Sequence, residues 1–192
     1  MGLNIRDIIP RKEIELADLK GKIICVDAFN TLYQFLSTVR QPDGTPLMDS
    51  KQRITSHLSG IFYRNVNLLS QGIRLVYVFD GQPPDLKRAT HEKRGDVRDT
   101  AKSKYETAKN SEDLTAMKRY SSQLVRLNDE IIEESKELLH AMGIQVVQGL
   151  SEGEAEAAHL VKMNKEIYAS ASQDYDSLLF GTPKLIQNLT LS

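Results

Sequence analysis

Six acidic side chains occupy similar positions in this 192-residue sequence, each just after an apolar run or at the expected start of a helix: Asp27, Asp80, Glu152, Glu154, Asp174 and Asp176. No lysine or arginine lies between Gly149 and Val161 or between Glu166 and Pro183. Carboxylates that converge without basic partners repel one another and resist ionising together. A hard divalent cation removes that conflict, because Mg²⁺ and Mn²⁺ prefer oxygen ligands. The pattern predicts a two-metal site that acts on phosphodiesters.

Each of these acids also has an ordinary structural explanation. Ser151 and Glu154 have the spacing of a helix capping box, and the helix dipole favours acids in a first turn. Asp174 could start a turn, while Asp27 and Asp80 could cap the elements that follow them. The metal interpretation therefore depends on the whole set of acids in four similar contexts, and not on any one of them.

The elements that would position these acids alternate between strand and helix. Short apolar runs predict buried strands at 22–27, 73–80, 144–147 and 167–171. Apolar residues at helical spacing predict helices over 28–39, from 54 to a stop at Gly72, from an N-cap at Asn128 to Gly143, and from 151 onward. The stretch from Pro183 to Leu191 suggests a final strand or hairpin. This alternation indicates an α/β fold with a central, mainly parallel sheet flanked by helices.

Parallel strands would bring the acids to one edge of the sheet. Asp27 and Asp80 end the first two predicted strands, and the other two acid pairs follow the third and fourth strands. In open α/β sheets, ligands bind outside the carboxyl ends of the strands. Two acids at one sheet edge make a sharper prediction of a site than two acids in unrelated loops.

The character of the sequence changes between Asp85 and about Arg126, where apolar residues thin out and charge dominates. Steps of four, three, four and four residues place five basic side chains on one helix face: Lys87, His91, Arg94, Arg98 and Lys102. The ordinary explanation is a solvated helix face. Because so few apolar positions can pack, we expect a mobile, protruding helical region that orders on meeting a polyanion.

The composition is that of a soluble globular protein, with 40% hydrophobic and 27% charged residues, and the length suits one sizeable domain. The net charge of −1 does not exclude nucleic-acid binding, which depends on local patches. Cys25 is the only cysteine, so an internal disulfide is excluded and a reducing compartment is favoured. The sequence has no apolar run of membrane-spanning length and no signal peptide, so we expect a cytoplasmic protein without membrane contact.

Four stretches closely resemble the flap endonucleases, which belong to the structure-specific 5′ nucleases. These stretches are VDA at 26–28, YVFDGQPP at 77–84, SEGEAEA at 151–157 and ASASQDYD at 169–176. Gly2-Leu3 and the segment 9–14 resemble the archaeal branch of the family. The resemblance runs from residue 2 to the last residue in the family's order. It implies a PIN-like nuclease core over 1–192, in which 85–126 is a helical arch.

The resemblance also implies an activity and a set of metal ligands. Flap endonucleases hydrolyse a DNA phosphodiester near the base of a 5′ flap, and act as 5′–3′ exonucleases, in replication and repair. They use two Mg²⁺ ions, which Mn²⁺ can replace. By resemblance, one metal belongs mainly to Asp27, Asp80, Glu152 and Glu154, and the other to Asp174 and Asp176. Two metals about 4 Å apart can activate a water and stabilise the leaving oxygen of an in-line displacement.

In the arch, the resemblance places two catalytic basic residues, Lys87 and Arg94, which help to steer the scissile phosphate. The single strand of the flap passes through or under this arch. His91, Arg98 and Lys102 share the same predicted face, so we expect them to contact DNA as well.

Three further residues fall where the family contacts DNA. Tyr33 matches an aromatic that stacks on the DNA near the cut, with core packing as the alternative. Arg40 and Arg64 match positions implicated in DNA contact, with a surface ion pair as the alternative. The loop at 44–47 resembles part of the apolar wedge that bends the junction.

Flap endonucleases continue well beyond the length of this chain. The further part normally supplies another aspartate to the metal site, a helical hairpin that grips duplex DNA, and often a tail that binds the sliding clamp. We therefore expect a fragment or one half of a split protein, with any clamp contact in the absent tail.

Three other functions fit parts of the pattern. A phosphatase of the haloacid dehalogenase type needs an acid two residues after the first, where this chain has Phe29. A PIN-type ribonuclease could use a similar acidic site on RNA, although a long basic arch favours a threaded DNA flap. A non-catalytic DNA-binding fragment is the alternative from a different class.

Overall fold

The computed structural model describes residues 5–82, 100–101, 103–111, 113–121, 124 and 126–190. No helix within those ranges is both long enough and apolar enough to cross a membrane.

The chain divides into two compact units, which we describe separately. The sheet unit comprises Met1–Thr31, Phe62–Pro83 and Lys136–Ser192. The helical unit comprises Leu32–Ile61 and Pro84–Ser135. The chain therefore leaves the sheet unit twice and returns to it twice. All six predicted metal ligands belong to the sheet unit.

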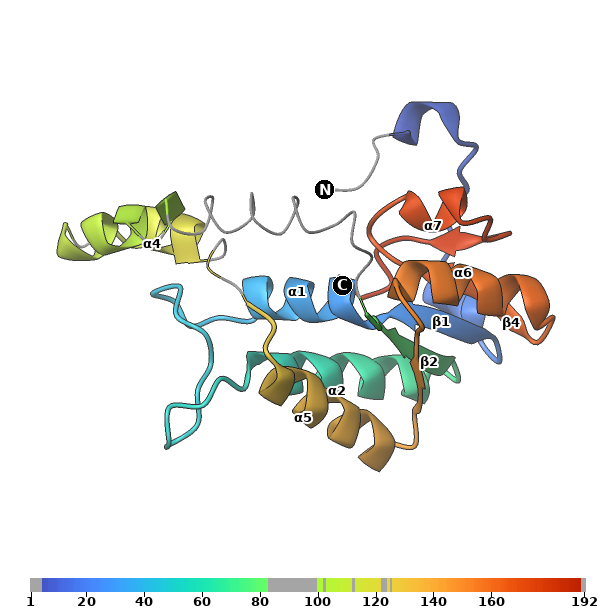
Figure 1. Ribbon diagram of the computed structural model, residues 1–192, viewed down its shortest axis with the longest axis horizontal. Helices are drawn as coiled ribbons and strands as arrows, with labels where there is room; N and C mark the ends of the chain where they lie inside the picture. The colour runs from blue at the N-terminus through green and yellow to red at the C-terminus, as the bar shows by residue number, and fades with distance from the viewer. Residues whose placement is uncertain are drawn as a thin grey trace. The chain divides into compact units, whose positions relative to one another are not determined.

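A five-stranded sheet with the order β3-β2-β1-β4-β5 forms the centre of the sheet unit (Figure 1). Its strands are β1 (Ile23–Asp27), β2 (Arg74–Phe79), β3 (Gln145–Gln148), β4 (Ile167–Ala171) and β5 (Leu185–Ile186). Every neighbouring pair is parallel. The four predicted strands and the parallel sheet are confirmed. The end of the chain adds a strand parallel to β4, so the hairpin alternative was wrong.

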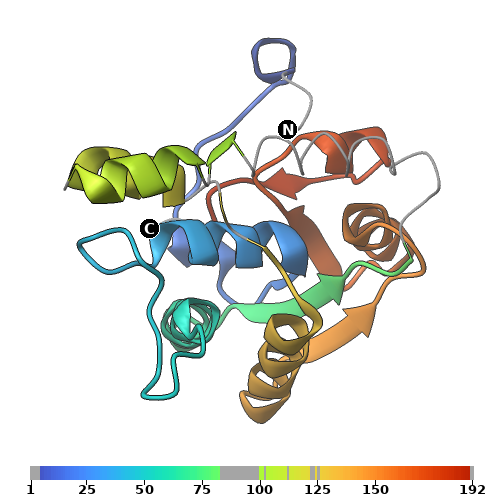
Figure 2. The ribbon, with the colours of Figure 1, turned by 60° about the vertical axis from the view of Figure 1, so that its left-hand side comes forward.

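Alternate residues of the central strands face opposite layers. Cys25, Val76 and Val78 pack in one apolar cluster with Ala157 and Val161 of α6 (Gly153–Met163). On the other face, the Tyr77 hydroxyl donates to the Asn65 side chain of α2 (Ser56–Ser70) at 2.9 Å. Figure 2 shows α6 and α2 on opposite sides of the sheet. Two buried faces explain why the strands read as nearly continuous apolar runs.

Caps set the ends of two helices as the sequence predicts. The α2 helix stops before Gly72, which adopts a positive φ of 79° and donates its N–H to the Leu69 carbonyl at 2.9 Å. The α5 helix (Asp129–Ala141) begins after Asn128, whose side-chain oxygen accepts the Ile131 N–H at 2.9 Å.

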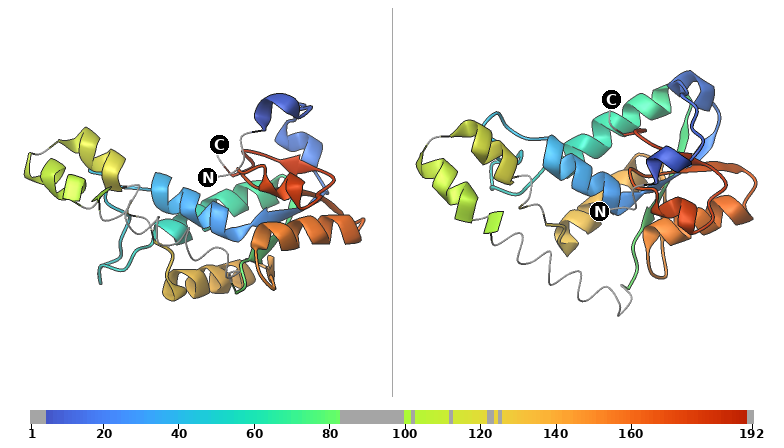
Figure 3. Two further views of the ribbon diagram at one scale, coloured as in Figure 1. Left: turned by 45° about the horizontal axis from the view of Figure 1, so that its top comes forward. Right: turned by 90° about the horizontal axis from the view of Figure 1, so that it is seen from above.

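Short helices form much of the described part of the helical unit. Residues 103–110 are helical, and α4 (Leu114–Ser121) lies beside them (Figure 3). The Lys104 ammonium lies 5.7 Å from the centre of the Tyr120 ring. Ala101, Ala108 and Met117 are buried, which is more apolar packing than the sequence led us to expect in this span.

The predicted arch over 85–126 falls only partly within the described residues, since 85–99 lie outside them. All five basic residues of its expected stripe also lie outside the described residues: Lys87, His91, Arg94, Arg98 and Lys102. The arch and its DNA contacts therefore stay predictions.

The backbones of the two loops that carry Asp80 and Glu152 approach each other closely. The N–H of Gly81 donates to the Ser151 carbonyl at 2.5 Å. A Cβ placed on Gly81 would lie 2.2 Å from the Gly149 carbonyl oxygen and 2.5 Å from that of Leu150. Real Cβ atoms do not approach backbone oxygens so closely, so any side chain at Gly81 would push these loops apart.

We predict that Gly81→Ala lowers the free energy of unfolding by about 3 kcal/mol, as overpacking in a tight site does. Gly143→Ala is the control, because its Cβ would meet no atom within 4 Å and its cost comes only from a positive φ of 72°. That control should lose about 1–2 kcal/mol. Urea denaturation of both variants measures the difference, and equal losses would contradict the close approach.

Candidate metal centre

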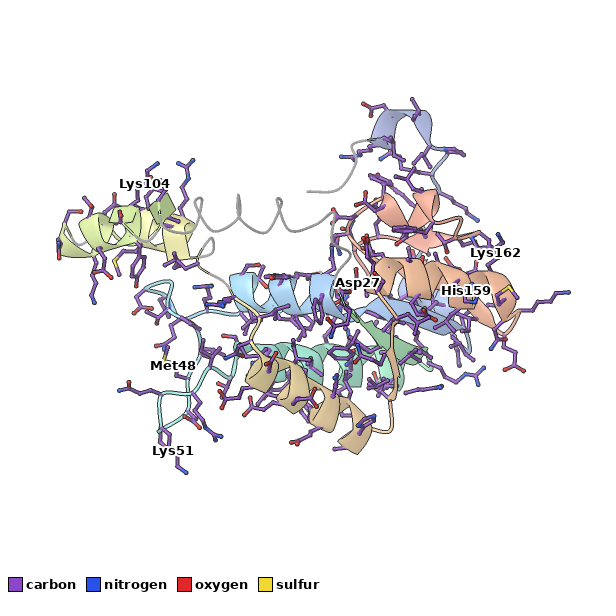
Figure 4. All side chains as sticks on the ribbon, viewed as in Figure 1. Asp27, Met48, Lys51, Lys104, His159 and Lys162 are labelled. Carbon is purple, nitrogen blue, oxygen red and sulfur yellow. The ribbon has the colours of Figure 1, made fainter. Side chains whose placement is uncertain are left out.

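All six predicted ligands lie at the carboxyl edge of the parallel sheet. Asp27 ends β1 and Asp80 follows β2. Glu152 and Glu154 lie at the start of α6, after β3. Asp174 and Asp176 follow β4, and Asp176 is the first residue of α7 (Asp176–Leu179). Figure 4 labels Asp27 where β1 passes into α1 (Ala28–Thr38), near the start of α6. The sheet therefore gathers side chains that are up to about 150 residues apart in sequence.

Asp27 is the most enclosed of these acids, with only 5% of its surface exposed. Its Oδ1 accepts the Asn30 N–H at 3.1 Å, so it caps α1, as one of the ordinary explanations predicts. The pKa of Asp27 is raised to about 8, chiefly by burial and also by the nearby carboxylates of Glu154 and Asp80, against the opposing effect of backbone hydrogen bonds. Ionising this group at neutral pH needs a compensating positive charge.

Asp80 connects the end of β2 to the start of α6. Its Oδ1 accepts the Gly153 N–H at 2.8 Å, and its backbone carbonyl accepts the side-chain amide of Gln148. The N-cap position of α6 is Glu152, which makes no side-chain capping bond. The capping box predicted for Ser151 and its partner three residues on is therefore wrong, because a carboxylate from a neighbouring strand satisfies the helix N-terminus instead.

Glu154 lies among the other acids. Its Oε1 accepts the Ser172 hydroxyl at 2.7 Å. Burial raises the pKa of Glu154, and Asp176, Asp174 and Asp80 raise it further, against the Ser172 hydrogen bond. Three other carboxylates thus act electrostatically on this one group, which supports the prediction that the acids form one cluster.

Two uncharged residues link acids from different elements. The Asn30 side-chain amide donates to Asp174 Oδ2 at 3.3 Å, and Ser172 Oγ accepts the Asp174 N–H at 3.2 Å. Sequence reasoning missed both of them. Their only signal was position, since Asn30 is three residues after Asp27 and Ser172 is two before Asp174.

The donor set of the cluster suits a hard divalent cation, because all six candidate ligands are carboxylates. Across the part of the chain that the structure describes, which includes all six, no three acidic, histidine or cysteine side chains converge as the ligands of a single ion do. Burial and neighbouring carboxylates do raise the pKa of two of the acids, Asp27 and Glu154. The residues fit a metal centre in their chemistry, and the assignment of each ligand stays a prediction.

The two arginines predicted to contact DNA make internal hydrogen bonds. Arg40 donates from Nε to the Leu36 carbonyl at 2.9 Å and from Nη1 to the Gly44 carbonyl at 2.8 Å. Arg64 is 8% exposed, and its Nε donates to the Leu189 carbonyl at 3.0 Å. Burial lowers the pKa of both side chains. These bonds go to backbone carbonyls and are not the surface ion pairs that were the alternative explanation. Contact with DNA stays a prediction for both arginines.

Tyr33, the residue predicted to stack on DNA, is 42% exposed on α1. This exposure leaves much of the side chain available, in contrast to a fully packed core position. The predicted wedge loop is tied by antiparallel bridges between Arg40 and Pro46 and between Met48 and Ile54.

The structure thus combines a parallel α/β core with acids gathered at the carboxyl edge of its strands. Residues 4–101 match the XPG N-terminal domain and residues 143–192 match the XPG I-region. The chain therefore belongs to the XPG family.

Within this family the chain is similar to archaeal flap endonucleases. It is 55% identical over 192 residues to Flap endonuclease 1 of Thermococcus onnurineus, covering 100% of this chain and 56% of that protein. Flap endonuclease 1 of Pyrococcus furiosus shows the same identity and coverage. The chain thus spans about half the length of the curated relatives it matches.

Solved structures confirm the predicted fold. Flap endonuclease-1 from Methanococcus jannaschii is 40% identical, with a TM-score of 0.75, over 100% of this chain and 60% of that one. The catalytic core of Rad2 in complex with a DNA substrate is 31% identical, with a TM-score of 0.65, over 93% of this chain and 46% of that one.

The raised pKa of Asp27 predicts how stability depends on pH in the presence of a chelator. Between about pH 4 and pH 8 only the folded chain holds the Asp27 proton, so the free energy of unfolding should fall as pH rises through this window. Each pKa unit between the two states is worth about 1.4 kcal/mol. Asp27→Asn should flatten the profile, as measured by denaturant titrations from pH 4 to pH 8.

The control is Glu137→Gln, which removes an exposed carboxylate from α5 and should leave the slope of the profile unchanged. A slope that Asp27→Asn also leaves unchanged would show that Asp27 is ionised in the folded chain.

Proposed function

We propose that this chain is the nuclease core of a structure-specific 5′ flap endonuclease that hydrolyses DNA phosphodiesters with divalent metal ions. The observation that carries the proposal is the cluster of carboxylates at one sheet edge, where burial and neighbouring acids raise the pKa of both Asp27 and Glu154. Such a site gains from binding cations, and cations bound there attract a phosphodiester.

The carboxylates divide by element into two groups that would hold two ions. We propose that the acids of β1, β2 and α6 hold one ion, and that those after β4 hold the other: Asp27, Asp80, Glu152 and Glu154, then Asp174 and Asp176. When bound, the metals supply an activated water and stabilise the leaving oxygen. The chain's own part is to fix these oxygens on strand ends and helix starts and to bury the innermost of them. We propose Mg²⁺ as the ion in use, with Mn²⁺ able to replace it.

The substrate proposal combines the site with the relatives. We propose DNA with a 5′ flap or a nicked or branched junction, which the relatives' name and the DNA bound to Rad2 support. Residues 85–126 would form the arch for the single strand, with DNA contacts from six side chains: Tyr33, Arg40, Arg64, His91, Arg98 and Lys102. A sliding clamp would bind only through sequence beyond this chain, in the part of the relatives that it does not cover.

Asp174→Asn should abolish Mg²⁺-dependent cutting of a labelled 5′ flap while leaving DNA binding intact or slightly stronger. The metal contributes several kcal/mol to the transition state, and each 1.36 kcal/mol is tenfold in rate, so we expect a loss of about 100-fold or more. Removing a negative charge also reduces repulsion of phosphate. Single-turnover cleavage and fluorescence anisotropy, in the chain extended to the relatives' length, measure the two effects.

Glu137→Gln is the matched control, because it removes one negative charge outside the cluster. Cleavage by Asp174→Asn at the rate of this control would show that the site is misassigned. Running the same assay on the matching RNA separates a PIN-type ribonuclease, and DNA binding without any cleavage in Mg²⁺ or Mn²⁺ would favour a non-catalytic DNA-binding fragment.

We also propose that Lys87 and Arg94 act on the scissile phosphate. Arg94→Ala should slow the single-turnover rate more than it weakens DNA binding, because a contact made chiefly in the transition state contributes to rate and not to affinity. Lys109→Ala, which removes an exposed basic residue from the same span, should weaken binding slightly and leave the rate constant unchanged. Equal effects of the two variants on the rate constant would contradict a catalytic role for Arg94.

A further inference from the structure

Asn30 contacts two acids that the proposed function places in different metal groups. Its backbone N–H donates to Asp27 Oδ1 at 3.1 Å, and its side-chain Nδ2 donates to Asp174 Oδ2 at 3.3 Å. Resting on the proposed function, we infer that Asn30 is a positioning residue of the metal centre, which holds the carboxylate after β4 at a set distance from the carboxylate that ends β1.

The chemistry of the amide suits this role. A carboxylate can be held by any donor, but a lysine or arginine would bring a positive charge that competes with a cation for the same oxygen. The Asn30 amide donates a hydrogen bond and carries no net charge, so Asp174 is oriented while the cluster keeps its negative charge for the ion. Partners of this kind, one step outside the metal ligands, set ligand orientation and metal affinity.

The position of Asn30 is itself fixed. β1 passes into α1 without a connecting loop, and Asn30 is the third residue of that helix. The register of β1 against β2 and β4 therefore sets where the amide lies. A donor on a regular element places its partner more accurately than a donor on a loop.

A second uncharged residue completes the link to α6. Ser172 Oγ accepts the Asp174 N–H at 3.2 Å and donates its hydroxyl proton to Glu154 Oε1 at 2.7 Å. A continuous series of hydrogen bonds thus runs from Asp27 through Asn30, Asp174 and Ser172 to Glu154. It joins acids from β1, the segment after β4 and α6, so a shift of one carboxylate is resisted by the other two.

The test is a calorimetric titration of the 192-residue chain with Mn²⁺ and with Mg²⁺. Asn30→Met removes the side-chain donor, keeps four side-chain heavy atoms and keeps the backbone bond to Asp27. Loss of such a partner costs about 10-fold to 100-fold in metal affinity, so we expect at least a 10-fold weaker dissociation constant at one site. Gln71→Met is the control, because it removes a side-chain amide that donates to Asn67, away from the acidic cluster, and should leave both constants unchanged.

A second comparison separates positioning from a general loss of structure. If Asn30 acts through Asp174, adding Asn30→Met to Asp174→Asn should change metal affinity no further than Asp174→Asn alone. A further 10-fold loss in the double variant would overturn the inference. Should Asn30→Met fail to fold by circular dichroism, Asn30→Ala carries the same test with a residue of high helix propensity.

The outcomes for the inference and for the proposed function are distinct. A wild-type chain that binds neither Mn²⁺ nor Mg²⁺ would overturn the proposed metal centre and the role of Asn30 with it. A wild-type chain that binds divalent ions, with Asn30→Met binding them equally well, would overturn the role of Asn30 alone. A weakened site in Asn30→Met and an unchanged one in Gln71→Met would support both.

Discussion

Mutual repulsion among carboxylates at one sheet edge is the constraint on which the rest of this structure depends. Parallel strands deliver the acids to the same edge, and burial of Asp27 raises the cost of charging it. A fold that gathers such groups must restrain them with contacts that do not neutralise them. Backbone N–H groups, an amide and a hydroxyl supply these contacts here, so the cluster keeps its affinity for positive charge.

The structural and functional explanations of these acids turn out to be compatible. Asp27 caps the helix that follows it, and Asp80 satisfies the first amide of a helix from another part of the chain. A capping bond occupies one oxygen in a fixed direction, which orients the carboxylate as a whole. The bonds that satisfy the N-terminal N–H groups of these helices therefore also hold the candidate ligands in position before any cation binds.

The strands and helices could be predicted from the sequence because they depend on local patterns of residues. The hydrogen bonds between distant segments could not be predicted in this way. Short apolar runs located β1, β2, β3 and β4, because buried parallel strands have that composition. The bond from Asn30 to Asp174 joins residues 144 positions apart, and that from Gly153 to Asp80 spans 73 positions, so neither leaves a local signal. The false capping box at Ser151 arose for the same reason, since a remote carboxylate took its place. The basic stripe of the arch lies outside the described residues, so its prediction is untested.

The order of strands in the sheet has a consequence for synthesis of the protein. β1 lies between β2 and β4, and Ile24 pairs with Ala169, so the central strand gains its second neighbour only after most of the chain exists. Pairings this distant form late, because long loops must close first. The ribosome adds about 5–20 residues per second. During that time Asp27 and Asp80 are made before the other candidate ligands and cannot yet form a cluster with them. The candidate ligands come together only when the segment after β4 has emerged, so the acidic cluster forms late in synthesis.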